Sequence, residues 1–171
     1  IYNETNTGPD VTNRTWFQAF DQFVNRWGEL SGNTLIYETN DDSVTLSGAN
    51  PGQLGVRADL RIGGHSIDGD GGILAYNFFP DNGDMVIDTN DDTYLNLSGD
   101  SLVLRNVLAH EHGHGLGVGH DCPVSNSKLM EPFLVTGFDG PQYDDILAVQ
   151  RNYGDVYETG GGNEDVTMAS H

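Results

Sequence analysis

The feature that most constrains this chain is a histidine- and glycine-rich run near residue 110. It contains His110, Glu111 and His114 in the spacing H-E-x-x-H. On a helix, His110 and His114 lie one turn apart on the same face, so both imidazoles can reach one cation. Glu111 lies beside them, placed to polarise a water bound to that cation. This pattern on a helix is typical of zinc proteases.

The run continues with Gly117 and His120 at three-residue intervals. A continuing helix would direct residue 120 elsewhere, so the chain must turn sharply, and glycine takes the positive φ of such a turn. Three neutral imidazoles with a fourth position left for water would form a catalytic rather than a closed structural zinc site. The alternative is a histidine-rich helix end with solvated side chains, which requires five fixed positions to coincide by chance.

The whole pattern, His110-Glu111-x-x-His114-x-x-Gly117-x-x-His120, resembles the long zinc motif of the metzincins. Ten residues on, Leu129-Met130-Glu131-Pro132 resembles their Met-turn. The resemblance implies that Met130 lies beneath the metal. The alternative for this segment is an ordinary loop.

Length and charge limit the other possibilities. A chain of 171 residues is expected to form one domain with a real core. Its 7 basic and 26 acidic residues give a net charge of −19, which makes nucleic acid and anionic membranes poor partners. No apolar run approaches the ~20 residues of a membrane span. Because the chain opens at Ile1 without a signal peptide, we expect a processed, secreted fragment. We also expect calcium sites and a monomeric state.

The single cysteine, Cys122, excludes an internal disulfide. It is interpreted as a free thiol rather than a zinc ligand or a latency switch.

Hydrophobic periodicity predicts a first helix from Asp10 or Thr12 to about Glu29, with an aromatic stripe facing the core. The members of that stripe are Trp16, Phe20, Phe23 and Trp27. Strands are predicted at Leu35–Tyr37, Val56–Ile62, Ile73–Phe79 and Met85–Asp88, with a glycine loop between Gly63 and Gly72. The zinc helix is predicted from Leu102 to about Gly115, capped near Ser98 or Asp100, and a last helix from Asp144 to Gly154.

Over most of residues 1–154 the chain resembles the matrixins, the matrix-metalloproteinase-like metzincins. The resemblance rests on the aromatic first helix, on the segment from Asp68 to Tyr76, and on Asp144-Asp145-Ile146 in the last helix. It implies an α+β metzincin catalytic domain: a twisted mixed sheet, a long first helix, an active-site helix, a Met-turn and a C-terminal helix. The domain is assigned to 1–154, its zinc-helix part to 101–154, and a flexible acidic, glycine-rich tail to 155–171. Asp121 departs from the matrixin pattern, in which Ser or Thr follows the third histidine.

The resemblance also implies a calcium site. Its ligands would be the carboxylates of Asp68, Asp88 and Asp91 and the carbonyls of Gly69, Gly71 and Ile73. Oxygen ligands from a glycine loop suit Ca²⁺, although a solvated turn is the alternative. A second calcium is possible at Asp59 and Asp84.

The structural second zinc of matrixins is expected to be absent. Two of its histidine positions are Tyr76 and Val86 here, and the one histidine nearby, His65, cannot close a tetrahedral site alone. His112 lies about 200° round the helix from His110 and is expected to be exposed and idle.

These observations favour a zinc endopeptidase. His110, His114 and His120 would hold the zinc, and Glu111 would take a proton from water and pass it to the leaving amine. An extended polypeptide would add along the Ile73–Phe79 strand. The alternatives are a self-processing protease of narrow specificity and a non-catalytic, metal-stabilised binding module, against which the intact Glu111 counts.

The pocket for the residue after the cut is predicted from the resemblance. Asn106 lies one turn before His110, at a position that borders this pocket in matrixins, and Pro132, Phe133 and Leu134 would wall it. The alternative is that Asn106 only bonds a nearby backbone group.

Overall fold

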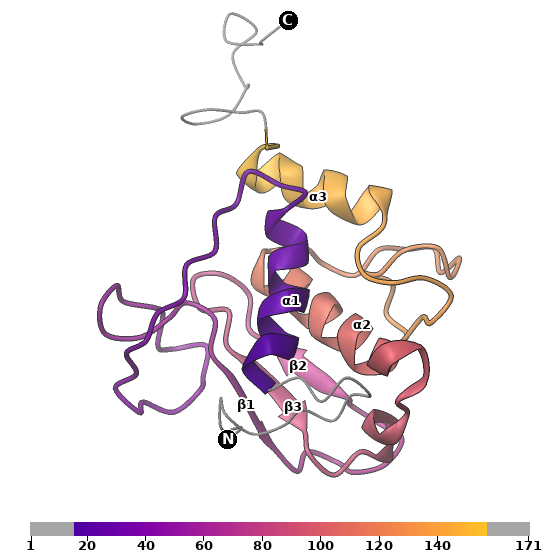
Figure 1. Ribbon diagram of the computed structural model, residues 1–171, viewed down its shortest axis with the longest axis horizontal. Coiled ribbons are helices and arrows are strands. Elements are labelled where there is room, and N and C mark those ends of the chain that lie inside the picture. The colour runs from indigo at the N-terminus through magenta and orange to yellow at the C-terminus, as the bar shows by residue number, and fades with distance from the viewer. Residues whose placement is uncertain (1–15, 157–171) are drawn as a thin grey trace, which may run out of the picture.

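The computed structural model describes residues 16–156, and Figure 1 shows α1 and α2 beside a small sheet, with α3 at the end away from it. In chain order the elements are α1 (Trp16–Gly28), β1 (Ile62–His65), β2 (Ala75–Asn77), β3 (Met85–Asp88), the 3-10 helix η1 (Asp92–Leu95), α2 (Ser98–Gly115) and α3 (Tyr143–Tyr153). This is the α+β class that the sequence predicts. The predicted caps Asp10 and Thr12, and all but the first two residues of the tail 155–171, lie outside the described residues.

The sheet has the order β1-β3-β2. β1 runs parallel to β3, and β2 runs antiparallel to it, with Tyr76 opposite Val86. All four residues of the central strand β3 are buried. On β2, Ala75 and Asn77 are buried while Tyr76 is exposed, because successive strand side chains point to opposite faces. β2 is therefore an edge strand that carries an exposed aromatic side chain.

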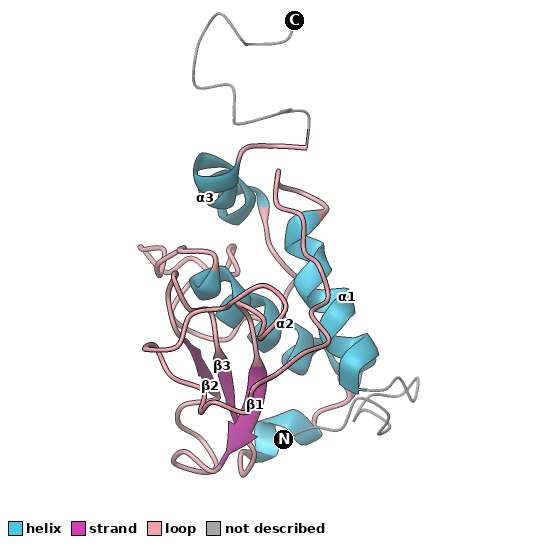
Figure 2. Ribbon diagram, turned by 90° about the vertical axis from the view of Figure 1, so that its left-hand side faces the viewer, coloured by secondary structure: helices cyan, strands magenta, loops and turns pink. Residues whose placement is uncertain are grey.

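Helix α2 is central to the fold, and Figure 2 shows it between α1 and the sheet. Two hydrophobic clusters form on it. The first joins α1, the sheet and α2 through Ala19, Phe23, Ala75, Met85, Ile87, Leu104, Val107 and Leu108. The second joins α1, α2, α3 and the loops between the last two through Trp27, Ala109, Leu116, Val118, Leu129, Met130 and Val149. Burial in both clusters fixes the end of α2 that carries His110 and His114.

The aromatic stripe of α1 belongs to the core, as predicted. Phe23 and Trp27 are buried, and Phe20 packs against the first cluster. The indole Nε1 of Trp27 donates a hydrogen bond to the carbonyl of Ala109 at 2.9 Å. This bond ties α1 to the middle of α2. The side chain of Trp16 lies outside the described part of the chain.

The predicted strand Leu35–Tyr37 is wrong. That segment has no strand pairing, and Ile36 is 81% exposed. Further along the same connection, side chains rather than a sheet bind the backbone: Arg61 donates to the carbonyl of Val44, and Asp84 accepts from the N–H of Ser47. A hydrophobic triplet alone therefore did not recruit the segment to the sheet.

Two further strand predictions had the wrong limits. The strand expected at Val56–Ile62 begins only at Ile62 and runs through Gly63 and Gly64, which were predicted to be loop. A turn precedes it, in which Val56 donates to the carbonyl of Gln53. The strand expected at Ile73–Phe79 is limited to Ala75–Asn77, because the N–H of Ile73 is bonded to the Asp68 carboxylate instead of to a strand. The prediction for Met85–Asp88 is confirmed.

The helix predictions were more accurate. Gly99, Asp100 and Ser101 have positive φ, so the regular part of α2 begins at Leu102, as expected. Ser98 and Asp100, near which a cap was predicted, lie in or just before this irregular stretch, and Leu97, the residue before Ser98, makes no side-chain capping bond. α3 ends at Tyr153, and the glycine predicted at its exit, Gly154, is the C-cap with φ +74°. None of the described helices combines the length and apolar composition that a membrane crossing requires.

Candidate metal centre

The structure brings His110, His114 and His120 together, with their ligand atoms within 4.8 Å of one another. The Nε2 atom of His120 lies 3.2 Å from the Nε2 atoms of His110 and of His114. Tetrahedral zinc with Zn–N bonds of about 2.0–2.1 Å separates its nitrogen ligands by about 3.3 Å. The two distances therefore fit a zinc ion between the rings, and within the described residues no other group of three such side chains gathers in this way.

Backbone carbonyls orient two of these rings. The Nδ1 atom of His110 lies 2.7 Å from the carbonyl oxygen of Leu129, and Nδ1 of His114 lies 2.7 Å from that of Val118. Each Nδ1 must carry the proton, so each Nε2 presents a lone pair. Burial lowers the pKa of His110 to about 4 and also lowers the pKa of His114. Neutral imidazoles with facing lone pairs are the donor set that a cation requires.

The turn after α2 brings His120 back to the helix. Gly117 has φ +86°, and its N–H bonds the carbonyl of His114. The N–H of Val118 bonds the carbonyl of Gly113. A residue with a Cβ would be strained at this φ, so the glycine in the sequence pattern has the conformational role predicted for it.

Met130 belongs to the second core cluster and is fully buried. Helix α2 approaches it closely at Gly113, where a Cβ atom would lie 2.4 Å from the Met130 sulfur and 3.1 Å from the Trp27 ring. Only glycine fits there without displacing the methionine. Gly113 on α2 therefore allows the Met130 side chain to pack directly against this helix.

Glu111 follows His110 on α2, with 8% of its surface exposed. Burial raises the pKa of its carboxyl group to about 7. A carboxyl group with such a pKa can accept and release a proton near neutral pH.

The prediction for His112 was wrong. It is 3% exposed, not solvated, and burial lowers its pKa to about 4. The helical-wheel argument failed because α2 is packed on more than one side, so a direction away from the ligands is not a direction toward solvent. Neither ring nitrogen has a hydrogen-bond partner.

Two buried carboxylates hold the loop that carries Met130. Glu131 accepts from the N–H groups of residues 125, 126, 127 and 128 and from the Ser125 hydroxyl. Asp145 accepts from the N–H groups of Leu129 and Met130. Backbone hydrogen bonds lower the pKa of Glu131 to about 2, against the opposing effect of burial. Sequence reasoning missed both roles, although Asp145 at the third position of a helix, after Gln142, is a capping-box signal.

The predicted pocket residues occupy two different environments. Phe133 is 67% and Leu134 42% exposed, and Pro132 is partly buried. Asn106 is 1% exposed, and its amide bonds three backbone groups: the carbonyls of Val135 and Phe138 and the N–H of Gly140. The alternative of a bond to nearby backbone describes the Asn106 amide, and its place beside the pocket stays a prediction.

The predicted calcium ligands lie in one region but bond one another. Asp88 accepts from the N–H groups of Asp68 and Gly69, and Asp91 accepts from that of Gly71. The carboxylate of Asp68 accepts from the N–H of Ile73. Backbone hydrogen bonds, the largest from Asn90, lower the pKa of Asp88 to about 2. The Asp88 carboxylate is therefore charged at neutral pH, and all three carboxylates bond N–H groups between residues 68 and 73.

The residues suggested for a second calcium are arranged differently. Asp84 is fully buried, and its two oxygens accept from Nε and Nη2 of Arg61 at 3.0 and 2.6 Å. Asp59 is exposed. The guanidinium supplies the positive charge that Asp84 requires, which disfavours a cation at this place.

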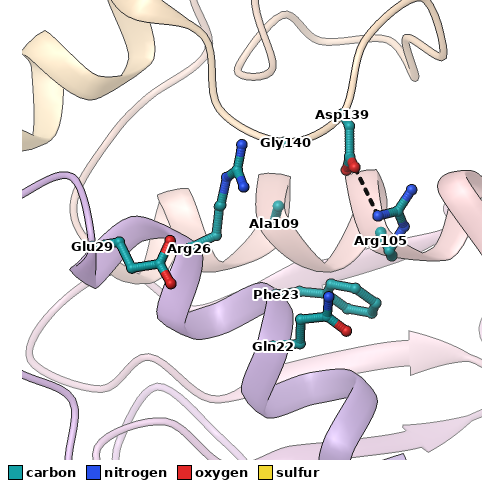
Figure 3. Close-up of a pocket in the computed structure, with 8 residues that line it drawn as sticks. All are labelled: Gln22, Phe23, Arg26, Glu29, Arg105, Ala109, Asp139 and Gly140. Atoms are coloured by element: carbon teal, nitrogen blue, oxygen red, sulfur yellow. Dashed lines mark hydrogen bonds and ion pairs between the residues drawn. The ribbon is translucent and has the colours of Figure 1, made fainter. Parts of the chain in front are cut away.

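A separate cavity of about 150 Å³ lies between α1, α2 and residues 139–140, as Figure 3 shows. Arg105 extends along it and donates to Asp139 at 2.7 Å. Its lining consists of Gln22, Phe23, Arg26, Glu29, Arg105, Ala109, Asp139 and Gly140. Since none of the three histidines lines this cavity, it is distinct from the metal centre.

Comparison with known proteins matches a matrixin family model to residues 2–154. Matrix metalloproteinase-18 of Xenopus laevis is 42% identical over 164 residues, which are 90% of this chain and 32% of that protein. Interstitial collagenase of Equus caballus is 29% identical over 161 residues, 90% of this chain and 31% of that protein. Karilysin of Tannerella forsythia is 31% identical over 132 residues, 71% of this chain and 27% of that protein. The chain spans about a third or less of the length of these relatives.

Proposed function

The chain belongs to the matrixin family, and from this premise we propose that it is a zinc-dependent endopeptidase with His110, His114 and His120 as the ligands of one catalytic zinc. The observation that carries the proposal is the histidine geometry. The Nε2 separations fit tetrahedral zinc, and the Nδ1 atoms of His110 and His114 are held by backbone carbonyls.

Glu111 is the general base and acid in this proposal. When bound, the zinc supplies a Lewis acid that polarises the scissile carbonyl and lowers the pKa of a water molecule. Glu111 accepts the proton of the attacking water and then donates it to the leaving amine. Its pKa, raised to about 7 by burial, suits both transfers near neutral pH.

The edge strand β2 receives the substrate. Its outer edge has no partner strand in the described sheet, so an extended polypeptide can add there through main-chain hydrogen bonds. Exposed Tyr76 and Phe79 lie on or just after this strand, and the Phe79 ring centroid is 5.5 Å from that of His114. The edge therefore leads toward the metal ligands.

The segment after Met130 forms the other side of the cleft. We assign Leu129–Pro132 as a Met-turn, because Met130 is buried beneath the zinc helix and Leu129 bonds His110. Exposed Phe133 and Leu134, with Pro132, give an apolar wall to the pocket for the residue after the cut. We expect a preference for a medium apolar residue such as Leu or Met at this position. Each methylene gained or lost should change the discrimination between substrates by about 1–3 kcal/mol.

Calcium is proposed at the glycine loop, with Asp68, Gly69, Gly71, Ile73, Asp88 and Asp91 as its ligands. The support is that three carboxylates each bond an N–H group of this loop, whose carbonyl groups are the kind of ligand that Ca²⁺ takes. A second zinc is not proposed. Tyr76 and Val86, which face each other across β2 and β3, offer no imidazole, and His65 is alone.

The peptidase domain is assigned to residues 1–154, with 155–171 as a tail. We propose polypeptide substrates, an extracellular location and a monomeric state. The net charge of −19 supports the absence of nucleic-acid partners.

Digestion of casein or gelatin by the parent and by Glu111→Ala tests the function. The variant should keep its zinc and fold and lose about 10²–10⁴-fold in rate, the range for a general acid–base group. Glu29→Ala, which removes an exposed glutamate in the turn just after α1, is the matched control and should retain full activity. More than a tenth of the parent rate in Glu111→Ala would sink the mechanism.

The same assay separates the alternatives. A self-processing protease would cut its own chain and leave casein and gelatin intact, and Glu111→Ala would stop that cleavage. A metal-stabilised binding module would cut neither, and Glu111→Ala would change nothing.

A further inference from the structure

Both polar atoms of the Asn106 side chain form hydrogen bonds with backbone groups of one loop. Its Nδ2 donates to the carbonyls of Val135 and Phe138 at 2.7 and 2.9 Å, and its Oδ1 accepts from the N–H of Gly140 at 2.9 Å. We call residues 135–140 the pinched loop, because both of its ends meet this one amide. Two donors and one acceptor at this reach are the chemistry of asparagine; aspartate lacks the donors and leucine lacks all three.

The position of Asn106 relates this loop to the metal centre. Asn106 lies four residues before His110 on α2, a rise of about 6 Å. His110 bonds the carbonyl of Leu129, and Asn106 bonds that of Val135. The chain between these carbonyls, six residues that could extend about 20 Å, begins and ends on a single helical turn. Residues 130–134, which we call the arch, therefore cannot run straight and must fold back toward this turn of α2.

Burial along the arch matches this geometry. Met130 and Glu131 are buried at its start, while Phe133 and Leu134 are exposed at its end, immediately before the pinched loop. The start is held by the Glu131 and Asp145 carboxylates. The end has Asn106 as its buried polar anchor, with Phe138 packed against the second core cluster.

We propose that Asn106 is a positioning residue for specificity: by closing the pinched loop it fixes where Phe133 and Leu134 stand, and so the size of the pocket after the scissile bond. This inference rests on the proposed peptidase function. Asn106 does not contact the substrate. It acts through the arch.

The loop also has a surface brace that serves as a control. Arg105, next to Asn106, donates to Asp139, whose side chain is 55% exposed, at the rim of the cavity in Figure 3. Exposed ion pairs contribute little to geometry or stability. Asp139→Asn removes this brace and leaves the Asn106 amide intact.

The test compares peptide-library profiles for the parent, Asn106→Asp, Asn106→Leu and Asp139→Asn, with kcat, KM, zinc content and melting temperature for each. In both Asn106 variants the ratio of kcat/KM between medium and large residues after the cut should change at least five-fold. The change should occur mainly in KM, with one zinc retained. Asp139→Asn should keep the parent ratio within two-fold.

An unchanged ratio in folded Asn106 variants, with only a lower melting temperature, overturns the proposal and leaves Asn106 as a structural residue. A parent that cuts no peptide overturns the peptidase function itself, so the two failures are distinguishable. Should both variants fail to fold, amide hydrogen exchange on the parent decides: the Gly140 N–H should be protected and the Gly137 N–H at the exposed tip should not. Equal, fast exchange at both positions overturns the pinch.

Discussion

Residues 98–154 and residues 33–97 each carry a proposed metal site, and the two regions are built differently. In the first, the helix α2 sets the spacing of His110 and His114, and buried side chains hold the loops after it. In the second, strands of three or four residues are joined by long connections, and polar side chains bind much of the backbone. In the first region, helical spacing by itself places metal ligands on one face. In the second region, the position of a ligand depends on carboxylates whose negative charge neighbouring groups must balance.

The largest effect is expected from the helical region. His120→Ala should lower zinc affinity and hydrolysis on the order of 100-fold or more, since even partners of metal ligands contribute 10–100-fold. The fold should persist, because the core clusters on α2 do not include His120. Elemental analysis, peptide hydrolysis and thermal melting measure the three quantities.

His65→Ala is the matched control from the other region. His65 is exposed, and its Nδ1 lies against the carbonyl of Ser66. The variant should retain the single zinc of the parent. Loss of one zinc equivalent in this variant would show that the glycine loop holds a second ion.

The next largest effect tests the charge balance of the loop region. Asp84→Ala removes the buried partner of the Arg61 guanidinium, leaves only the exposed Asp41 carboxylate at 3.8 Å, and should destabilise the fold by about 3–5 kcal/mol, measured by urea unfolding. Asp42→Ala removes the partner of Arg57, a pair at a more exposed position, and should cost about 0–1 kcal/mol. Similar losses in the two variants would contradict a special role for the buried pair.

Calcium should stabilise the same region by mass action. At 100 times its dissociation constant, calcium would add about 2.7 kcal/mol, read as a rise in melting temperature. Asp88→Asn should abolish the rise, whereas Asp92→Asn, a change at an exposed neighbour, should preserve it. The calcium proposal fails if the parent melts at the same temperature with and without excess calcium.

The smallest effect is a change in acid stability caused by Glu131. The folded pKa of this carboxyl group is about 2, below its usual 4.5, so its contribution is complete above about pH 4.5 and is lost as the pH falls toward 2. The melting temperatures of the parent and Glu131→Gln should therefore differ most above pH 4.5 and converge near pH 2. A difference that grows on acidification would contradict the depressed pKa.

The contrast between the regions also explains what the sequence could predict. The three histidines and the turn at Gly117 followed from helix geometry, which is nearly independent of context. The strand at Leu35–Tyr37 and the exposure of His112 depended on what packs nearby, and both predictions were wrong. Asn106 was located correctly on the helix, but only the folded loop shows that its amide faces backbone groups.

The open edge of β2 has a consequence for the chain in concentrated solution. Within residues 16–156 this edge has no partner strand, so with Tyr76 exposed it can accept a strand from another copy of the chain as readily as from a substrate. The net charge of −19 keeps copies apart, but this repulsion is screened beyond about 10 Å in 0.1 M salt. Colloidal stability and access to the cleft are therefore linked: salt that weakens the repulsion exposes the same edge to self-association.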